Sequence, residues 1–323
     1  MPENHSNISI VIVTYKRQEL LKTLFDSICQ LTIAPEHVVV VDNENSFETQ
    51  QLTETPSALT EFTHVHYVPM LENTGGAGGF SKGVETAYNL GAEWIWVMDD
   101  DVRVFPNALE MLGKWTTHGL RDNHLAIQPQ RENFDGAPFY WQYDFRTGLG
   151  IPNPVAPAAF LQGETYRVIN TACFEGGLFH RELVKQIGFP DKRFFIYWDD
   201  TIYGYLASKV TQPILIQETV MARTRTLEHV TIGKIRRLNS TSDMARYHIL
   251  RNRGYMAHYF REHGDYKPLI FGFGTFLTVA KEVIRIFALS DNKAKSFSEV
   301  RRGLKDGKQL RKDKNWRPMP KID

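Results

Sequence analysis

Three consecutive aspartates, Asp99, Asp100 and Asp101, directly follow the apolar run of residues 94–98. Adjacent carboxylates at the end of a buried strand repel one another, and a divalent cation held by carboxylate oxygens and substrate phosphates would neutralise them. Alternate residues of an extended chain face the same side, so Asp99 and Asp101 are the two candidates for binding one ion. A solvated acidic turn is the alternative. The neighbouring core strand favours the metal-binding interpretation.

A second pair of acids, Asp199 and Asp200, follows the aromatic run of residues 194–198. Aromatic neighbours can partly desolvate a carboxylate, which raises its pKa and suits a general base. The alternative is that one of these acids caps a helix over residues 202–208, and the two roles are compatible. His229 is a lone histidine, and by default such a residue is structural.

A glycine-rich segment, Asn73-Thr-Gly-Gly-Ala-Gly-Gly79, precedes the aspartate triplet. Its four glycines, beginning with Gly75 and Gly76, let the backbone approach a ligand and expose its amides. A mobile loop would show the same composition. The segment does not follow the first predicted strand, which argues against a dinucleotide fingerprint and against a nicotinamide cofactor.

Short apolar, β-branched runs predict the strands that would position these residues. Continuous runs of this kind are typical of strands buried on both faces. The predicted strands are residues 8–14, 37–42, 65–68 and 94–98, and helical spacing predicts helices over residues 17–31 and 83–90. Their alternation predicts an α/β fold with a Rossmann-like, mostly parallel sheet flanked by helices. Ligands of such sheets bind outside the carboxyl ends of the strands, where the polar motifs stand.

The rest of the chain predicts a pocket-forming region and a helical extension. Residues 128–167 are rich in Pro, Gly and aromatic residues and predict loops and short strands, followed by a strand within 173–181. Further helices are expected over 181–187 and 242–263. We therefore divide the chain into a catalytic domain, residues 1–235, and a helical, basic C-terminal region, residues 236–323.

Composition limits the function and the location. The formal net charge is +1 among 323 residues, which argues against a nucleic-acid partner. Cys29 and Cys173 stand in apolar surroundings and suggest buried free thiols in a reducing compartment. The polar N-terminus has no apolar segment of signal-peptide type, so a cytoplasmic protein is expected.

The last helices suggest contact with the inner face of the membrane. Residues 268–289 are apolar but interrupted by Lys281, Glu282 and Arg285, which are too costly for a spanning helix. Residues 293–321 carry eleven Lys or Arg and three acids. A helix lying on an anionic surface fits this pattern. An ordinary packing helix with a solvated basic tail is the alternative, and the oligomeric state is open.

Several motifs together resemble a known family. They are Ile12-Val-Thr-Tyr-Lys-Arg17, Val41-Asp-Asn43, Asn73 to Phe80, Trp96-x-Met-Asp-Asp-Asp101 and Trp198-Asp-Asp200. In this order, over roughly residues 8–230, the chain resembles family-2 glycosyltransferases of the GT-A fold. Within that family it resembles the bacterial galactofuranosyltransferases, to which the glycine-rich and Trp-Asp-Asp motifs are the more specific.

The resemblance implies a donor site for a UDP-linked sugar. Thr14, Tyr15 and Arg17 would hold its uracil and diphosphate, and Asp42 would bind the uracil. Asn73 would form the nucleotide side of the pocket. The donor site is also expected to include Gly75, Gly76 and Asp100.

The resemblance further implies a metal and a base. Asp99 would bind the ribose or the metal, and Asp101 would coordinate Mn²⁺ or Mg²⁺ with His229 as the second protein ligand. Asp200 matches the general base, while Trp198 and Asp199 would line the site for a glycan or lipid-linked acceptor.

The expected reaction is a single displacement with inversion, because the motifs supply one base and no nucleophile. Because the first predicted strand begins at residue 8, we expect no counterpart of the β-rich N-terminal domain of the mycobacterial polymerising enzymes, and we expect addition of a single sugar residue. Three alternatives remain: a rhamnosyltransferase on the same scaffold, a sugar-nucleotide-binding module without turnover, and a nucleotidyltransferase. A glycosyltransferase releases nucleoside diphosphate, whereas a nucleotidyltransferase releases pyrophosphate, so the released product distinguishes the two.

Overall fold

A computed structural model gives the fold. It describes residues 5–54, 63–137, 144–152, 160, 163–225, 229–232, 236–239 and 241–322, without the side chains of 5, 119–121, 229–232 and 236–239. The strands are β1 (His5–Ser6), β2 (Ile8–Thr14), β3 (Ala34–Pro35), β4 (His37–Asp42), β5 (His64–Pro69), β6 (Trp94–Asp99), β7 (Val102–Val104), β8 (Ala126–Glu132), β9 (Phe145–Arg146), β10 (Ile151–Pro152), β11 (Tyr166–Val168), β12 (Leu178–His180), β13 (Ile214–Arg223), β14 (His229–Ile232) and β15 (Arg236–Asn239). The helices are α1 (Gln18–Ile28), α2 (Phe47–Glu54), α3 (Gly75–Asn89), α4 (Ala108–Asp122), α5 (Arg181–Ile187), α6 (Asp199–Ala207), α7 (Asp243–Arg251), α8 (Arg253–Glu262), α9 (Pro268–Leu289) and α10 (Lys293–Lys312), with a short 3₁₀ turn at Lys192–Phe194.

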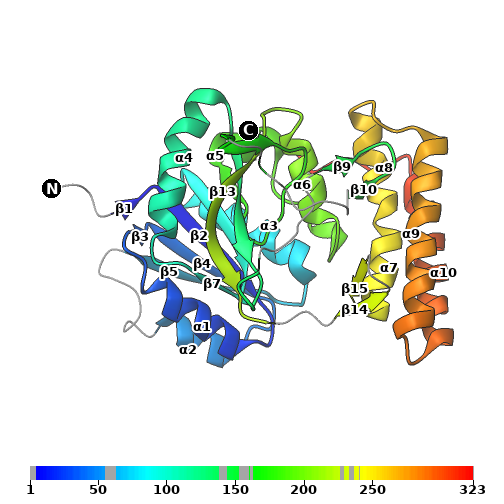
Figure 1. Ribbon diagram of the computed structural model, residues 1–323, viewed down its shortest axis with the longest axis horizontal. Coiled ribbons are helices and arrows are strands. Elements are labelled where there is room, and N and C mark those ends of the chain that lie inside the picture. Colours follow the sequence, from blue (N-terminus) through cyan, green and yellow to red (C-terminus); the bar gives the residue numbers. More distant parts are fainter. Residues whose placement is uncertain are drawn as a thin grey trace.

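A nine-stranded sheet forms the centre of the molecule (Figure 1). Its order is β11-β13-β8-β12-β6-β2-β4-β5, and β7 pairs with β13. The four strands β6, β2, β4 and β5 are parallel neighbours, as the sequence predicts. Strand β12 is antiparallel to both β6 and β8 and joins this parallel half to the rest of the sheet. The predicted α/β architecture of the GT-A type is confirmed.

Strand β2 explains how the core is built in two layers. Ile8, Ile10 and Ile12 face a cluster shared with α1 and α4, whereas Val11 and Val13 face a second cluster shared with α3, α5 and α6. Alternate residues of a strand point to opposite faces, so an uninterrupted apolar run is needed where both faces are covered. This burial fixes the sheet whose strand ends carry the polar motifs.

Helix α3 begins at Gly75, earlier than the predicted start at Gly83. The glycines allow the helix to lie very close to the sheet. A Cβ on Gly79 would lie 2.5 Å from Val13 Cγ1, and one on Gly83 would lie 2.3 Å from Val11 Cγ1. Glycine is a poor helix former, so the requirement for close packing outweighs local propensity here.

Helices α7 to α10 gather at one end of the molecule (Figure 1). The single helix predicted over 242–263 is divided at Asn252 into α7 and α8. Met256, Phe260 and Phe271 from this end share a buried cluster with Phe194 and Tyr205 from the sheet-containing part. In the described part of the chain, no helix combines the length and apolarity needed to cross a bilayer.

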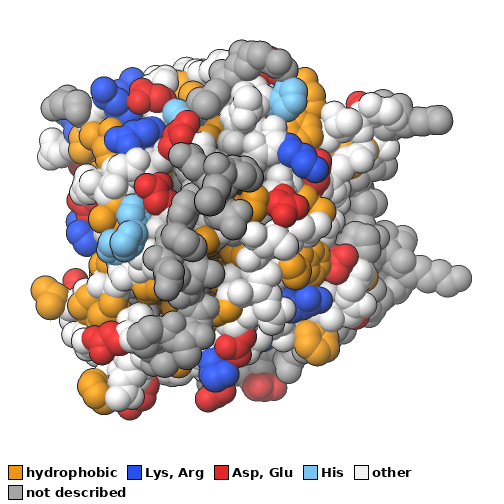
Figure 2. Space-filling view, turned by 90° about the vertical axis from the view of Figure 1, so that its left-hand side faces the viewer, with side chains coloured by type: hydrophobic (Ala, Val, Ile, Leu, Met, Phe, Trp, Pro, Cys, Tyr) orange, Lys and Arg blue, Asp and Glu red, His pale blue; other side chains and the backbone are white. Residues whose placement is uncertain are grey.

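The opposite, left-hand side of the molecule is shown in Figure 2. Acidic and basic side chains of the described residues are interspersed with hydrophobic ones on this face. Mixed charges of this kind neutralise one another locally.

Both cysteines are free thiols, with Cys173 buried and Cys29 partly buried, which agrees with the expectation from their surroundings.

Candidate active site

The carboxyl ends of three parallel strands bring the first group of predicted residues together. In the sheet register Thr14 at the end of β2 pairs with Asp42 of β4, and Val13 pairs with Asp99 of β6. Thr14 and Asp42 therefore share one row of the sheet, and Asp99 lies in the adjacent row, at the carboxyl edge of the parallel strands. A parallel α/β sheet binds its ligands at this edge.

Asp100 links the ends of β2 and β6. Its carboxylate accepts hydrogen bonds from Thr14 Oγ1 at 2.7 Å and from Arg17 Nη1 at 2.9 Å, and it is almost completely buried. Arg17 Nη1 also lies 3.5 Å from Asp101 Oδ2. Burial raises the pKa of Asp100, with Arg17 and Thr14 opposing the shift. Asp100 thus fixes the Arg17 guanidinium beside the acidic triplet.

Asp99 and Asp101, the outer acids of the triplet, have different surroundings from Asp100. Burial raises the pKa of Asp99 well above its ordinary value, and the charges of Asp101 and Glu175 raise it further. A bound cation would reverse this effect and keep the carboxylate ionised. Among the described residues, no group of three or more His, Cys, Asp or Glu side chains converges as a metal site. The predicted ligand His229 begins β14, and its side chain lies outside the described part of the structure.

A buried ion cluster that the sequence did not reveal lies behind the acids. Glu175 is paired in a bidentate manner with Arg223, and Arg131 Nε lies 3.2 Å from Glu175 Oε1. Burial opposes ionisation of Glu175, but Arg131 and Arg223 together lower its pKa. The backbone N–H of Thr224 donates to the Asp101 carbonyl at 2.9 Å, which ties the end of β13 to the triplet. The cluster joins segments far apart in the sequence, so no local pattern indicates it.

Asp42 and Asn43 shape the loops around the proposed donor side. Asp42 is fully buried and accepts hydrogen bonds from the backbone N–H groups of Glu44 and Ser46, each at 2.8 Å, and from Tyr67 Oη at 3.0 Å. Burial and Asp42 raise the pKa of Tyr67 to about 12. The structure therefore shows Asp42 holding its own turn, and its contact with uracil stays a prediction.

The start of α3 connects this loop to the second acidic pair. Asn43 Nδ2 donates to the Gly75 carbonyl at 3.2 Å, and Asn73 Oδ1 accepts from the Gly75 N–H at 2.9 Å. Gly75 has φ +70°, and a Cβ there would lie 2.1 Å from the carbonyl oxygen of Phe195. Gly76 faces open space. Only glycine fits at position 75, because the loop before Asp199 passes directly over it.

Asp199 and Asp200 form the first turn of α6. Trp198 is the N-cap, so neither acid caps the helix, although both stand where the helix dipole favours negative charge. Thr201 donates to Asp200 Oδ1 through its backbone N–H at 2.6 Å and its hydroxyl at 3.2 Å. Burial raises the pKa of both carboxyls, and the charge of Asp200 raises that of Asp199 further. Trp198 Nε1 donates to the Ile249 carbonyl at 3.0 Å.

The two acidic groups both adjoin one buried segment. The Cys173 thiol and the Arg131 charge both act on the Asp200 carboxyl, and Glu175 acts on Asp99. Residues 173–175 are therefore close to both acidic groups. Arg17 adjoins the triplet, and the start of α3 contacts the loop before Asp199.

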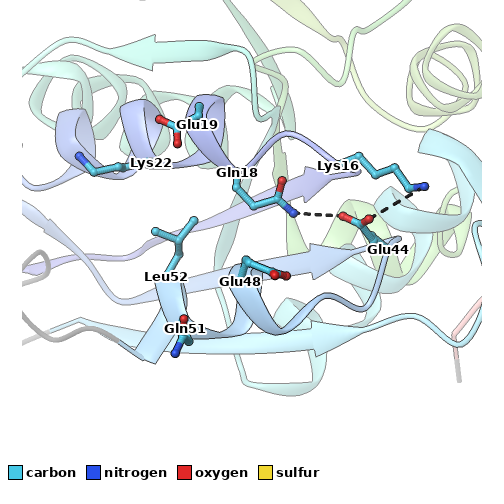
Figure 3. Close-up of a pocket in the computed structure, with 8 residues that line it drawn as sticks. All are labelled: Lys16, Gln18, Glu19, Lys22, Glu44, Glu48, Gln51 and Leu52. Carbon is cyan, nitrogen blue, oxygen red and sulfur yellow. Dashed lines mark hydrogen bonds and ion pairs between the residues drawn. The ribbon is translucent and has the colours of Figure 1, made fainter.

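An open hollow also lies between α1 and α2 (Figure 3). Its lining includes Lys16, Gln18 and Glu44, and Gln18 Nε2 donates to Glu44 Oε2 at 3.0 Å. The residues predicted to bind donor or acceptor do not line it, although Lys16 lies between Tyr15 and Arg17. Its lining is mostly charged and polar, as expected for a solvated surface hollow. We assign this hollow no part in the reaction. Tyr15 is 40% exposed beside it.

Comparisons with known proteins agree with this architecture. The chain is 32% identical over 200 residues to galactofuranosyltransferase GlfT1 of Mycolicibacterium smegmatis and 26% identical over 197 residues to dTDP-rhamnosyl transferase RfbF of Shigella flexneri. These alignments cover 60% and 61% of the chain and 62% of each relative. The chain thus spans less than two thirds of the length of these relatives.

Solved structures show the same fold. S. aureus TarS 1-349 superposes with a TM-score of 0.57 at 14% identity, over 94% of this chain and 81% of that one. Its complex with UDP gives a TM-score of 0.52 at 12% identity, over 98% and 99% of the two chains. The model of the family described as "Glycosyl transferase family 2" matches residues 9–188. As its sequence motifs predict, the chain belongs to glycosyl transferase family 2.

Proposed function

We propose that the chain is an inverting, metal-dependent glycosyltransferase that moves galactofuranose from UDP-galactofuranose to a glycan or lipid-linked glycan. The observation that carries this proposal is that both acidic groups adjoin the buried segment 173–175: Glu175 acts on Asp99 at the carboxyl end of β6, and Cys173 acts on Asp200 in the first turn of α6. The relative called galactofuranosyltransferase supports the sugar, and the UDP complex of TarS supports the nucleotide.

The donor would lie across the ends of β2 and β4 and the start of α3. Arg17 offers a cation held by Asp100, and the exposed ring of Tyr15 offers a surface for the base. Asp99 and Asp101, with His229, would hold Mn²⁺ or Mg²⁺ because their oxygens suit a hard cation. When bound, this ion would neutralise the charge that develops on the leaving diphosphate.

Asp200 would act as the general base. Its carboxylate takes the proton of the acceptor hydroxyl as that oxygen forms a bond to the anomeric carbon. The bond from this carbon to the diphosphate oxygen breaks at the opposite side, which inverts the configuration. Thr201 holds Asp200 Oδ1 at 2.6 Å, so the base has a fixed orientation. Burial raises its pKa above the usual aspartate value, which strengthens it as a proton acceptor.

A donor screen tests the proposal. Purified protein with Mn²⁺ or Mg²⁺ should release UDP from UDP-galactofuranose faster than from UDP-galactopyranose. It should release little dTDP from dTDP-rhamnose, although the likeness to RfbF makes a rhamnosyltransferase the second candidate. Faster turnover of the rhamnose or pyranose donor would replace the proposed sugar. Release of pyrophosphate, or binding without turnover of any donor, would contradict a glycosyltransferase.

We further propose that the enzyme works as a cytoplasmic protein at the inner face of the membrane, through the outer side of α9. The exposed large side chains of this helix are all apolar, and Phe276 is 63% exposed. They are Leu269, Ile270, Phe273, Phe276, Leu277, Ile284 and Phe287. We call this set the apolar face of α9.

Two of the three charges predicted to interrupt α9, Glu282 and Arg285, are turned away from this face. Glu282 is only 1% exposed and pairs with Arg285 and, at 3.7 Å, with Arg246 of α7. Buried charges are tolerated when they are paired in this way. The helix therefore places Glu282 and Arg285 toward the protein and its large apolar groups outward, whereas an ordinary surface helix turns its apolar side inward.

Helix α10 supplies positive charge next to the apolar face. Phe297 of α10 contacts Phe287 of α9, with ring centroids 5.6 Å apart. Arg301, Lys305 and Lys308 follow Phe297 along α10 and are exposed. Each basic residue near an anionic bilayer gains about 1 kcal/mol. An anionic lipid surface matches this combination of apolar and basic side chains.

Vesicle sedimentation tests the membrane contact. The protein should pellet with vesicles of phosphatidylcholine and phosphatidylglycerol at low salt and be released at high salt. Serine at Phe273, Phe276 and Phe287 together should abolish pelleting, whereas the control Phe47→Ser should not, because Phe47 is equally exposed but lies on α2. Unchanged pelleting of the triple variant would contradict the proposal. If the parent protein is a dimer and the triple substitution dissociates it, the apolar face of α9 instead binds a second copy of the chain.

A further inference from the structure

The backbone immediately before Asp199 has an uncommon conformation. Phe195, Tyr197 and Trp198 have φ values of 65°, 68° and 73°. The left-handed region costs a residue with a side chain roughly 1–2 kcal/mol. Such a conformation persists only where the surrounding structure imposes it. The strained stretch, residues 195–198, leads directly into the acidic pair.

One side-chain amide holds most of this stretch. Asn252 Nδ2 donates to the carbonyl oxygens of Phe194 at 2.9 Å, Ile196 at 2.8 Å and Tyr197 at 2.9 Å. Its two hydrogens serve three acceptors, so one hydrogen is shared. Asn252 is completely buried at the break between α7 and α8. The break gives this side chain access to the loop.

Neighbouring groups complete the support. Arg251 Nε donates to Asn252 Oδ1 at 2.9 Å, which orients the amide so that its nitrogen faces the loop. Arg251 Nη2 also donates to the Phe194 carbonyl at 2.9 Å. From the other side, the Ala77 N–H of α3 donates to the Phe195 carbonyl at 3.0 Å. Every carbonyl from residue 194 to 197 therefore has a donor.

We propose that Asn252 is a positioning residue for the reaction: it fixes the strained loop that aims Asp199 and Asp200 at the acceptor. The inference rests on the proposed function, in which Asp200 is the base. It makes the junction of α7 and α8 part of the catalytic apparatus. The loop is clamped between this junction and the glycine-rich start of α3, which joins the acceptor side to the donor side.

Steady-state kinetics test the role with the full-length protein. Asn252→Asp keeps the shape but replaces the donor with an oxygen facing three carbonyls, and Asn252→Ala removes the group. Both should lower kcat at least about tenfold, because small displacements of a reacting group are costly. The KM for the nucleotide sugar and the affinity for UDP should stay unchanged, since the donor contacts lie elsewhere.

Ser296→Ala is the matched control for lost stability. Ser296 is buried on α10, donates to Asp243 at 2.6 Å and accepts from Arg246 at 3.2 Å. Its loss weakens the contact of α10 with α7 without touching residues 194–198. All three variants should have a lower Tm, but only the two Asn252 variants should lose kcat. Equal kcat in Asn252→Ala and the control, measured well below both Tm values, would overturn the proposal.

Hydrogen exchange of the free protein provides a readout that is independent of activity. Amides of residues 194–203 should exchange faster in Asn252→Ala than in Ser296→Ala. Unchanged exchange in this segment would show that Asn252 does not hold the loop. If Asn252→Ala exchanges faster but the parent protein turns over no nucleotide sugar, Asn252 still holds the loop, and only the proposed function is contradicted.

Discussion

At the scale of single residues, neighbouring acids differ in their surroundings. Asp100 is held by Thr14 and Arg17, whereas the pKa of Asp99 is raised by burial and by the acids around it. Asp101 is 28% exposed, and its side chain lies at the outer side of the group. The middle aspartate is therefore held by contacts within the protein, and the outer two are the ones that we propose as metal ligands.

The first prediction concerns the cation. Asp101→Ala removes an oxygen ligand, so it should abolish transfer and weaken the metal-dependent binding of UDP, measured by titration calorimetry with Mn²⁺ and with chelator. Asp26→Ala, in an exposed pair with Lys22 on α1, is the control and should behave as the parent. Near-normal turnover of the Asp101 variant in chelator would remove the metal from the mechanism.

The second prediction separates chemistry from binding at Asp200. Asp200→Asn keeps the shape and loses the base, so kcat should fall about 10²-fold or more while UDP affinity persists. An equal loss of UDP binding would make Asp200 a donor-binding residue instead.

The third prediction is the pH dependence of the parent enzyme. A base must be ionised to accept a proton, so kcat should fall as the pH drops through its pKa. Burial raises the pKa of Asp200, and that of its neighbour Asp199, so this acid limb should lie above the ordinary aspartate value of about 3.9. The two carboxyls interact, so the limb reports the pair. A kcat that stays level down to that value would contradict the assignment.

At the scale of elements, the sequence predicts what depends on local pattern. Strands β2, β4, β5 and β6 follow from β-branched runs, and α5 has the predicted bounds. The start of α3 and the break at Asn252 do not follow from local pattern, because close packing and a tertiary hydrogen-bond network decide them. The ion cluster of Glu175 could not be predicted from local pattern either, because its two arginines come from β8 and β13, far away in the sequence.

The fourth prediction tests the packing of α3. Gly79→Ala would place a Cβ 2.5 Å from Val13 Cγ1 and 3.0 Å from Asn43 Nδ2. Overpacking of this kind should lower the free energy of unfolding by about 1–3 kcal/mol, measured by urea denaturation. Gly76→Ala is the control, because nothing lies within 4 Å of its added Cβ, and helix propensity should make it neutral or slightly stabilising. Equal stability of the two variants would contradict the close contact.

At the scale of the whole molecule, the division at residue 235 marks a change of composition rather than a break in the core. Phe145, Phe194 and Tyr205 share one buried cluster with Met256 and Phe271. The C-terminal segment then returns to the sheet-containing part, where the Ile322 N–H donates to the Lys185 carbonyl at 3.2 Å. Two regions that share a core in this way should unfold together.

The last prediction is therefore a single cooperative unfolding transition that depends on Trp316. This ring stacks on His258 with centroids 4.6 Å apart and lies 4.8 Å from the Arg193 guanidinium, so it links α8 to the segment before α6. Trp316→Ala should lower the stability of the whole chain by about 2 kcal/mol, as expected for the loss of a half-buried aromatic side chain. Far-ultraviolet circular dichroism and the fluorescence of the remaining tryptophans should give coincident transitions in parent and variant. Two separated transitions in the parent, with only one shifted by Trp316→Ala, would show that the two regions fold independently.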